Sequence, residues 1–314
     1  MIKLFGGSDS QEKMDFMVDK LEYKSGETVS GKLVIDGKKD VNVRSFRFIV
    51  EGKEKTNVTV SEPYTRSDSQ GNSTTSYKNV TYSDSNVFLS INLEQFLSKS
   101  SNTSLITNTD KDSGIIIQKG STEIPFEFPL PDNALSSYKG RNASINYEIK
   151  ATIDKKLRSD INTSTSINVV SIKEEKNNNN NSTIYVSDKS SKKGLYIKLI
   201  VAKNIYKIGD TIEGTIFIGK PSSIATTIRS IKMKLIGTEY AIARGKKVTT
   251  VIQNIDNEII NWKENEETPF KVKIPETITK SYRSKLSELY WEIKVTVDIP
   301  MDSDLNALAK IKII

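Results

Sequence analysis

The sequence predicts an all-β protein built from two tandem antiparallel β-sandwiches. Three observations lead to this prediction: the same landmarks occur twice in the same order, apolar and polar residues alternate in short runs, and helical patterning is scarce. Strict alternation places one set of side chains on a core face and the other set in water. Many short strands separated by turn residues are typical of antiparallel sandwiches.

The repeat is marked by four landmarks. Residues 23–31 (YKSGETVSG) recur at 206–214 (YKIGDTIEG), and residues 125–131 (PFEFPLP) recur at 269–275 (PFKVKIP). Each proline segment is followed by a Ser-Tyr pair and then by a strand-like run, YEIKATID in the first copy and WEIKVTVD in the second. Solenoid repeats run to roughly 20–50 residues. Copies of this length are instead duplicated domains, each large enough to own a core.

Individual strands follow from the alternation. Phe46, Phe48 and Val50 share one side of a strand in the first copy, and the second copy has the same pattern around Met233 and around Leu199. These runs are the predicted core strands of each sandwich.

The glycines of the first landmark are predicted to be structural. Gly26 and Gly209 each follow Tyr-Lys-x and precede an acidic residue and a β-rich run, so we expect them to supply positive φ in a tight turn. Residues 91–99 have the spacing of one short amphipathic helix, although a strand end running into a loop explains them equally well.

The domain boundaries follow from composition. We assign 1–172 to an N-terminal sandwich, 173–194 to a polar Asn-rich linker and 195–314 to a C-terminal sandwich. The linker is too polar to offset its ordering entropy by burying apolar area. The first copy has 39 extra residues between its landmarks, which form a long polar insertion near 61–113.

The composition argues against an enzyme. The chain has neither Cys nor His, which removes the usual general base, the common nucleophile arrangements and the commonest metal ligand. No calcium-type Asp-x-Asp loop is present either. We therefore predict no catalytic residues, no cofactor and no metal. Because no apolar run suits a secretory signal or a membrane span, we expect a cytoplasmic protein.

The net charge of +7 arises in the second half of the chain. Residues 1–172 hold 22 basic and 22 acidic residues, whereas 173–314 hold 24 and 17. This excess is either an ordinary solvated surface or a surface that attracts anionic lipid or an acidic segment of a partner. Nucleic acid is not an expected partner, since no basic stretch is interleaved with aromatics. The candidate basic surface consists of Lys232, Lys234, Arg244, Lys246, Lys247, Lys280, Arg283 and Lys285.

The insertion is the second candidate surface. Loops of sandwiches carry function, and long ones are either functional or disordered. Tyr64, Tyr77 and Tyr82 are possible anchors for a partner within it. A third route is the addition of a partner strand to a sheet edge, although the sequence does not identify an open edge.

These ordered motifs resemble those of the arrestin clan, and most of all the arrestin-domain-containing proteins, or α-arrestins. The resemblance rests on the repeated Tyr-x-x-Gly-acid element, on Gly52 and Gly237 as glycines that end a strand, and on residues 123–131 followed by 136–140. It covers about 15–170 and 195–300. It implies two immunoglobulin-like sandwiches, the arrestin N- and C-domains, joined by a hinge.

Members of that family are adaptors that bind cytoplasmic parts of membrane proteins and help to sort or internalise them. The resemblance therefore implies a non-enzymatic adaptor or scaffold in trafficking or signalling, cytoplasmic and peripheral at membranes or endosomes. No Pro-Pro-x-Tyr motif is present, so recruitment of a ubiquitin ligase by that route is not expected. Two alternatives stay open: a self-associating structural or regulatory sandwich without cargo, and a secreted or surface carbohydrate-binding module.

Overall fold

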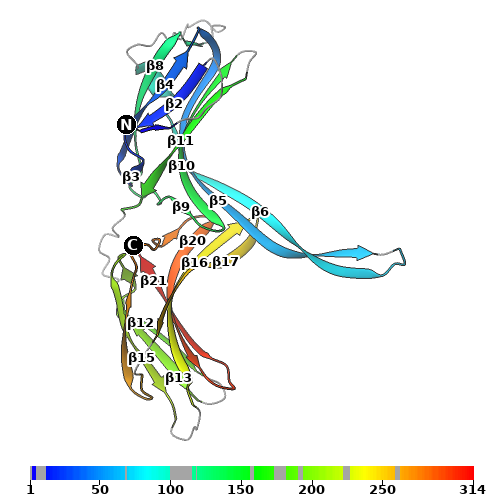
Figure 1. Cartoon of the computed structure of the whole chain (residues 1–314), viewed down its shortest axis with the longest axis vertical. Coiled ribbons are helices and arrows are strands. Elements are labelled where there is room, and N and C mark those ends of the chain that lie inside the picture. Colours follow the sequence, from blue (N-terminus) through cyan, green and yellow to red (C-terminus); the bar gives the residue numbers. More distant parts are fainter. Residues whose placement is uncertain are drawn as a thin grey trace. The chain divides into compact units, whose positions relative to one another are not determined.

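The computed structural model contains strands and a single 3₁₀ helix among the residues that it describes (Figure 1). The described residues are 2–4, 12–67, 69–99, 115–117, 119–155, 159–172, 182–189, 194–221, 227–258 and 262–314.

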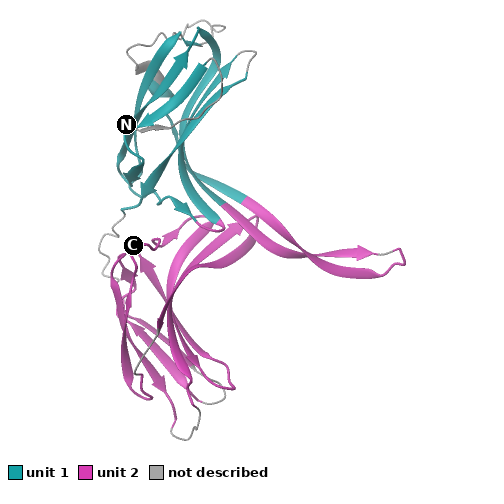
Figure 2. Cartoon of the chain, viewed as in Figure 1, with its two compact units in different colours: residues 1–55, 84–139, 143–173 teal, residues 56–83, 140–142, 174–314 magenta. Residues whose placement is uncertain are grey.

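The chain forms two compact units, coloured separately in Figure 2. Unit 1 comprises residues 1–55, 84–139 and 143–173. Unit 2 comprises residues 174–314 together with two segments from the first half of the chain, 56–83 and 140–142. The sequence boundary at 172 therefore separates most, but not all, of the two units.

The first sandwich has two sheets. One has the order β1-β2-β4-β8 and is antiparallel throughout. The other has the order β3-β11-β10-β5-β6, with β7 paired to β5 and β9 to β10. The bounds are β1 (Ile2–Leu4), β2 (Glu12–Val18), β3 (Glu22–Lys24), β4 (Thr28–Gly37), β5 (Val41–Ser67), β6 (Ser73–Asn92), β7 (Ile115–Ile117), β8 (Gly120–Pro129), β9 (Tyr138–Lys139), β10 (Ala143–Lys155) and β11 (Ile161–Val170).

The second sandwich repeats this topology, except that β7 has no counterpart in its described part. Its sheets have the orders β12-β13-β15-β18 and β14-β21-β20-β16-β17, with β19 paired to β20. The bounds are β12 (Ile184–Lys189), β13 (Tyr196–Val201), β14 (Ile205–Tyr206), β15 (Thr211–Gly219), β16 (Ser230–Ala243), β17 (Lys246–Glu258), β18 (Glu267–Lys273), β19 (Tyr282–Arg283), β20 (Ser287–Asp298) and β21 (Leu305–Ile313). The predicted fold class, a pair of duplicated antiparallel β-sandwiches, is confirmed.

The duplication extends to single hydrogen bonds. The hydroxyl of Tyr147 donates to the backbone oxygen of Leu135 at 2.8 Å. At the matching place in the second copy, Nε1 of Trp291 donates to the backbone oxygen of Thr279 at 3.0 Å. Both rings are fully buried, so the bond satisfies a polar atom that would otherwise be costly to bury.

Each sandwich has its own core. In unit 1, the rings of Phe16, Phe48 and Phe126 form a triangle with centroid separations between 5.4 and 6.1 Å. In unit 2, apolar residues from both sheets pack around Trp291. The alternation of buried and half-buried residues along β20 is the pattern that the sequence predicted for a core strand. Each fully buried large apolar side chain contributes about 1.5–3 kcal/mol to folding.

Two glycines were wrongly interpreted as strand ends. Gly52 lies inside β5 and Gly237 inside β16. A Cβ at Gly52 would lie 2.6 Å from the Phe88 ring, and one at Gly237 would lie 2.8 Å from the Trp291 ring. The glycines are needed because an aromatic ring lies against the strand at each of these points.

Three further elements differ in detail from the sequence expectation. The proposed helix over 91–99 is a 3₁₀ helix, η1 (Glu94–Lys99). The segment assigned to the linker contains β12, which pairs with β13 and so belongs to the second sandwich. The first part of the polar insertion is a β-hairpin, while residues 100–114 lie outside the described part of the chain.

Candidate functional site

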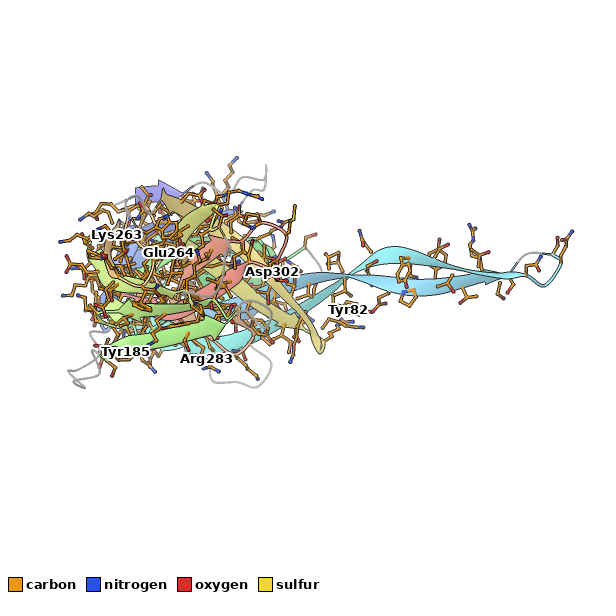
Figure 3. All side chains as sticks on the ribbon, turned by 90° about the horizontal axis from the view of Figure 1, so that it is seen from below. Tyr82, Tyr185, Lys263, Glu264, Arg283 and Asp302 are labelled. Atoms are coloured by element: carbon orange, nitrogen blue, oxygen red, sulfur yellow. The ribbon has the colours of Figure 1, made fainter. Side chains whose placement is uncertain are left out.

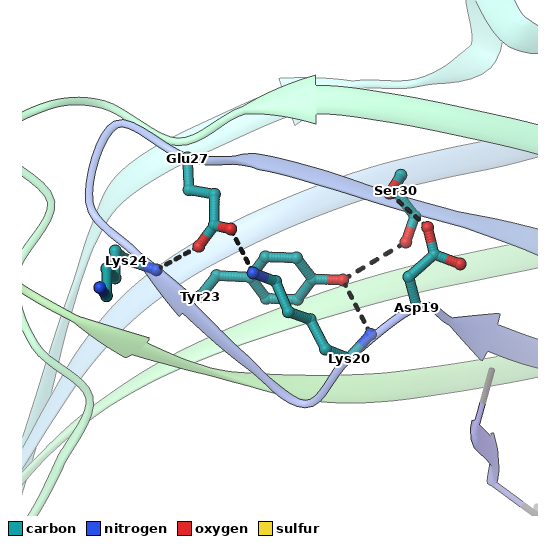
Figure 4. A network of polar contacts seen from close by, with 6 residues as sticks. All are labelled: Asp19, Lys20, Tyr23, Lys24, Glu27 and Ser30. Carbon is teal, nitrogen blue, oxygen red and sulfur yellow. Dashed lines mark hydrogen bonds and ion pairs between the residues drawn. The ribbon is translucent and has the colours of Figure 1, made fainter.

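The Tyr-x-x-Gly-acid landmark is a turn closed by its own side chains (Figure 4). The Glu27 carboxylate accepts from the backbone N–H of Lys24 at 2.8 Å and from the Lys20 ammonium. That ammonium also lies 5.0 Å from the centre of the Tyr23 ring. These two donors, Lys20 first, hold the pKa of Glu27 below its ordinary value.

The second copy builds the same turn. Lys203 pairs with Asp210 at 3.4 Å and lies 4.8 Å from the centre of the Tyr206 ring. The N–H of Lys207 donates to Asp210 at 2.9 Å, which lowers the pKa of this carboxyl. In both copies the charged side chains of the landmark bond within the turn itself. We therefore assign the landmark a structural role.

The predicted role of the two glycines in these turns is confirmed. Gly26 has a φ of 78° and Gly209 a φ of 82°, which L-residues with a Cβ rarely adopt. A Cβ would also meet the side chain of Asp132 in the first copy and of Glu276 in the second. The glycines therefore satisfy both a backbone and a packing requirement.

The feature that distinguishes the copies is the hairpin of β5 and β6 (Figure 3). These strands contain 27 and 20 residues, whereas their counterparts β16 and β17 contain 14 and 13. Hydrogen bonds between Thr59 and Thr81 at 2.8 Å and between Ser67 and Ser73 at 3.1 Å hold the two strands in register to near the turn. The part over 56–83 belongs to unit 2.

The base of this hairpin is fastened to the β16–β17 turn. Thr56 Oγ1 donates to the backbone oxygen of Ile242 at 2.7 Å. Glu62 accepts from the Tyr82 hydroxyl at 2.8 Å and pairs with Lys246 at 2.7 Å. Lys246, followed by Tyr82, holds the pKa of the Glu62 carboxyl below its ordinary value, and Glu62 in turn raises the pKa of Lys246.

A second attachment lies in the turn before β10. The carboxyl of Glu239, which has no exposed surface, accepts from the backbone N–H of Asn142 at 2.7 Å and from its Nδ2 at 3.0 Å. Asn142 Nδ2 also lies 2.9 Å from Thr250 Oγ1. The backbone oxygen of Asn142 accepts from the N–H of Asn57 at 2.8 Å. Asn142 therefore joins β16, β17 and the hairpin base.

Beyond Glu62 most described residues of the hairpin are exposed, on both faces. Tyr77 is 70 % exposed. Tyr64 is half-buried, with the Lys78 ammonium 5.9 Å from its ring centre. Of the three predicted anchors, Tyr82 is engaged at the base of the ribbon (Figure 3), and Tyr77 is the most exposed.

The structure divides the predicted basic surface in two. Lys232 and Lys234 lie towards the start of β16, opposite Thr296 and Lys294 of β20. The other six cations lie near the far end of that strand, roughly 30 Å away at about 3.3 Å per residue. At that end of β16, the N–H of Ile242 donates to the backbone oxygen of Leu286, so the segment that carries Arg283 and Lys285 lies beside it. These six are Arg244, Lys246, Lys247, Lys280, Arg283 and Lys285.

Carboxylates offset part of this charge. Exposed ion pairs stabilise a fold by only about 0–1 kcal/mol, so their main effect here is to reduce the positive charge that a partner would meet. At least three of the eight cations are paired: Lys234 with Asp256 at 2.7 Å, Lys246 with Glu62 at 2.7 Å and Arg283 with Glu288 at 3.9 Å.

Sequence reasoning missed Glu62, Asn142 and Glu239. A signal for Glu239 was present, because it continues the inward-facing alternation of Met233 and Leu235 along β16. A charged residue in such a position requires a buried partner. Asn142 carried no comparable signal, since its role depends on a contact across 97 residues.

Within the described ranges, no three His, Cys, Asp or Glu side chains gather to hold a metal ion. No helix in that same part of the chain is long and apolar enough to cross a bilayer.

Comparison with known proteins places the chain in a family. The family model for the N-terminal domain of arrestin (or S-antigen) matches residues 14–175, more than half of the chain. The chain belongs to the arrestin family. The matched part of this arrestin contains nearly all of the first sandwich, and the second sandwich repeats its topology. No curated protein matches the sequence.

Proposed function

We propose that this arrestin-family protein is a non-enzymatic adaptor that binds segments of other proteins, in particular cytoplasmic parts of membrane proteins, in trafficking or signalling. Membership of a family whose members are generally adaptors supports this role. The lack of His and Cys in the chain supports the non-enzymatic part of the proposal.

The observation that carries the proposal is the exposed end of the β5–β6 hairpin. A two-stranded ribbon without a core on either face is marginally stable in water. This one is anchored at its base by Thr56, Glu62 and Tyr82, so the fold itself does not require the residues beyond them. We therefore infer that the extension serves to bind a partner, which buries one face of the ribbon.

The exposed end offers two means of recognition. β6 is the last strand of its sheet, with β5 as its hydrogen-bonded neighbour, so a partner strand can add to its outer edge. Tyr77 supplies a large amphipathic side chain of the type enriched at binding hot spots. The neighbouring Ser and Thr side chains supply adaptable hydrogen bonding.

The same proposal gives the protein a cytoplasmic location, peripheral at membranes or endosomes. The six cations near the β16–β17 turn are the candidate contact with anionic lipid. Each exposed Lys close to such a membrane contributes about 1 kcal/mol, so several must act together.

Shortening the hairpin tests the proposal. Replacing residues 63–77 by Asn-Gly joins Glu62 to Lys78 through a two-residue turn and keeps the contacts at the base. We expect the full chain, but not the shortened one, to recover membrane proteins from the native cell, with both variants equally stable. Tyr77→Ser is the point-mutation counterpart and should weaken recovery. Equal recovery by the full and shortened chains would remove the hairpin from the binding role.

The alternative, a self-associating structural or regulatory sandwich, is distinguished in the same experiment. It predicts that only further copies of this chain are recovered, with or without the hairpin.

A further inference from the structure

One sheet face of unit 2 differs in chemistry from its counterpart in unit 1. The face is the outer side of the sheet β12-β13-β15-β18, opposite the core. Tyr196 and Phe217 lie on it with ring centroids 5.8 Å apart. The Lys198 ammonium lies 5.5 Å from the Tyr196 ring centre and 5.6 Å from that of Phe217.

A glycine makes room for this arrangement. Gly219 is opposite Tyr196 in the β13–β15 pairing, and a Cβ there would lie 2.1 Å from the Tyr196 ring. Unlike Gly26 and Gly209, Gly219 does not have a positive φ. Its role is therefore to let the ring lie on the strand.

The first copy has no aromatic ring at either position: Lys13 stands in place of Tyr196, and the buried Val34 stands in place of Phe217. Lys13 is opposite Asp36 where the second copy has Tyr196 opposite Gly219. Lys32, which pairs with Glu123 at 2.6 Å, stands where the second copy has a threonine. Since the first sandwich folds without these two rings on its face, the aromatic face of the second is not required for folding.

The face is complementary to itself. The β-ladder places Lys198, Phe217 and Glu267 in one row across β13, β15 and β18. The next row contains Ile200, Thr215 and an exposed proline, Pro269.

In a symmetric dimer the two faces can meet across a two-fold axis that lies between them and runs parallel to β15. β13 of one copy then lies over β18 of the other. Lys198 meets the partner's Glu267, Ile200 meets the partner's Pro269, and Phe217 meets its own counterpart. Every contact except the central one occurs twice, as an isologous interface requires.

We propose that this face is a homodimer interface, with a second copy of this chain as its occupant. Lys198 and Glu267 are both exposed, and neither forms an ion pair among the described residues of its own chain. Tyr185 of the edge strand β12 is 74 % exposed (Figure 3). In the proposed dimer it lies beyond the partner's β18.

The dimer is expected to be weak. Three facing strands at about 4.8 Å spacing and about 20 Å of strand length give a face of roughly 300 Å². Stable interfaces bury about 800 Å² on each partner, so we expect association at high micromolar concentration. The dimer is independent of the proposed adaptor role, because the hairpin contacts β16 and β17 of the other sheet.

Charge exchange provides the test, with sedimentation velocity of the full chain as the measurement. Lys198→Glu or Glu267→Lys alone makes both pairs of the dimer repulsive, and each should weaken association at least tenfold. An equimolar mixture of the two variants restores both pairs, so its affinity should return to within about threefold of the original. Lys232→Glu, an equal charge change on the other sheet, should have no effect.

A chain that stays monomeric at several hundred micromolar would overturn the proposal. The proposal would also be overturned by a dimer whose dissociation constant is unchanged by both single substitutions, or by a mixture of the two variants that does not associate. The rescue requires both variants to be folded, which their circular dichroism spectra test. One of the two variants can fail to fold. In that case, the doubly exchanged chain, Lys198→Glu with Glu267→Lys, replaces the mixture. Both of its pairs are attractive again, so it should dimerise like the original chain, and a monomer would overturn the proposal.

Discussion

Asn142→Ala should destabilise unit 2 more than any other truncation of an Asn side chain in the described part of the chain. The substitution leaves the backbone of the turn unchanged, including the N–H that donates to Glu239 at 2.7 Å. It removes the two contacts of Nδ2, one to the buried Glu239 carboxyl at 3.0 Å and one to Thr250 Oγ1 at 2.9 Å.

The expected cost follows from these two contacts. A hydrogen bond to a neutral group contributes about 0.5–1.5 kcal/mol, and one to a charged group about 1.5–3 kcal/mol. Because Glu239 is fully buried, water does not replace the lost donor. Together these give a loss of about 3 kcal/mol in the free energy of unfolding of unit 2.

Tryptophan fluorescence isolates the relevant unit. The chain contains two Trp residues, Trp262 and Trp291, and both belong to unit 2. Urea denaturation followed at this signal should show a lower midpoint at an unchanged slope. In thermal unfolding, a loss of about 3 kcal/mol corresponds to about 6–12 °C for a unit of this size.

Asn254→Ala is the matched control. Asn254 lies in β17 of the same unit and is exposed, so its removal should change stability by less than about 0.5 kcal/mol. If Asn142→Ala is as mild as this control, the side-chain contacts of Asn142 do not hold the turn, and the reasoning is refuted.

Three further predictions concern other parts of the molecule. Tyr147→Phe should lower the stability of unit 1 by about 1–2 kcal/mol in calorimetry, because the backbone oxygen of Leu135 loses its donor; no change would mean that water replaces the hydroxyl. In carboxyl NMR titrations Glu27 should titrate below its ordinary pKa of 4.5, and Lys20→Met should raise the midpoint. Because the pKa of Glu27 is lower in the folded chain than in the unfolded chain, its contacts stabilise the fold at pH values above the ordinary pKa. This stabilisation is lost as the pH falls through the lowered pKa. The chain should pellet with phosphatidylserine liposomes at low salt and be released at high salt; salt-independent or absent binding would contradict the lipid contact.

The sequence was sufficient to predict the architecture because the chain contains two copies of one pattern. A single alternating run fits many folds, but matched turns, proline segments and strands in one order fit a duplicated sandwich. The same comparison located the insertion between Tyr23 and Pro125, where the first copy is longer.

Pairing partners were harder to predict. Residues 61–92 are rich in Ser, Thr and Asn, a composition shared by loops and by exposed ribbons. The continuation of β5 and β6 as strands follows from cross-strand bonds such as Thr59 to Thr81, which composition does not reveal. The eight predicted cations form two groups for a similar reason, since strand length separates Lys232 from Lys246 although both lie on one hairpin.

A photo-crosslinking amino acid at position 77 tests the central claim most directly. In the native cell, the full chain carrying it there should form adducts with another polypeptide. The same group at position 301, where Met301 is fully exposed outside the proposed surfaces, should form none. Adducts at 77 that are absent at 301 are the predicted result. Equal labelling at both positions, or no adduct at 77, would contradict the claim that the hairpin binds a protein partner.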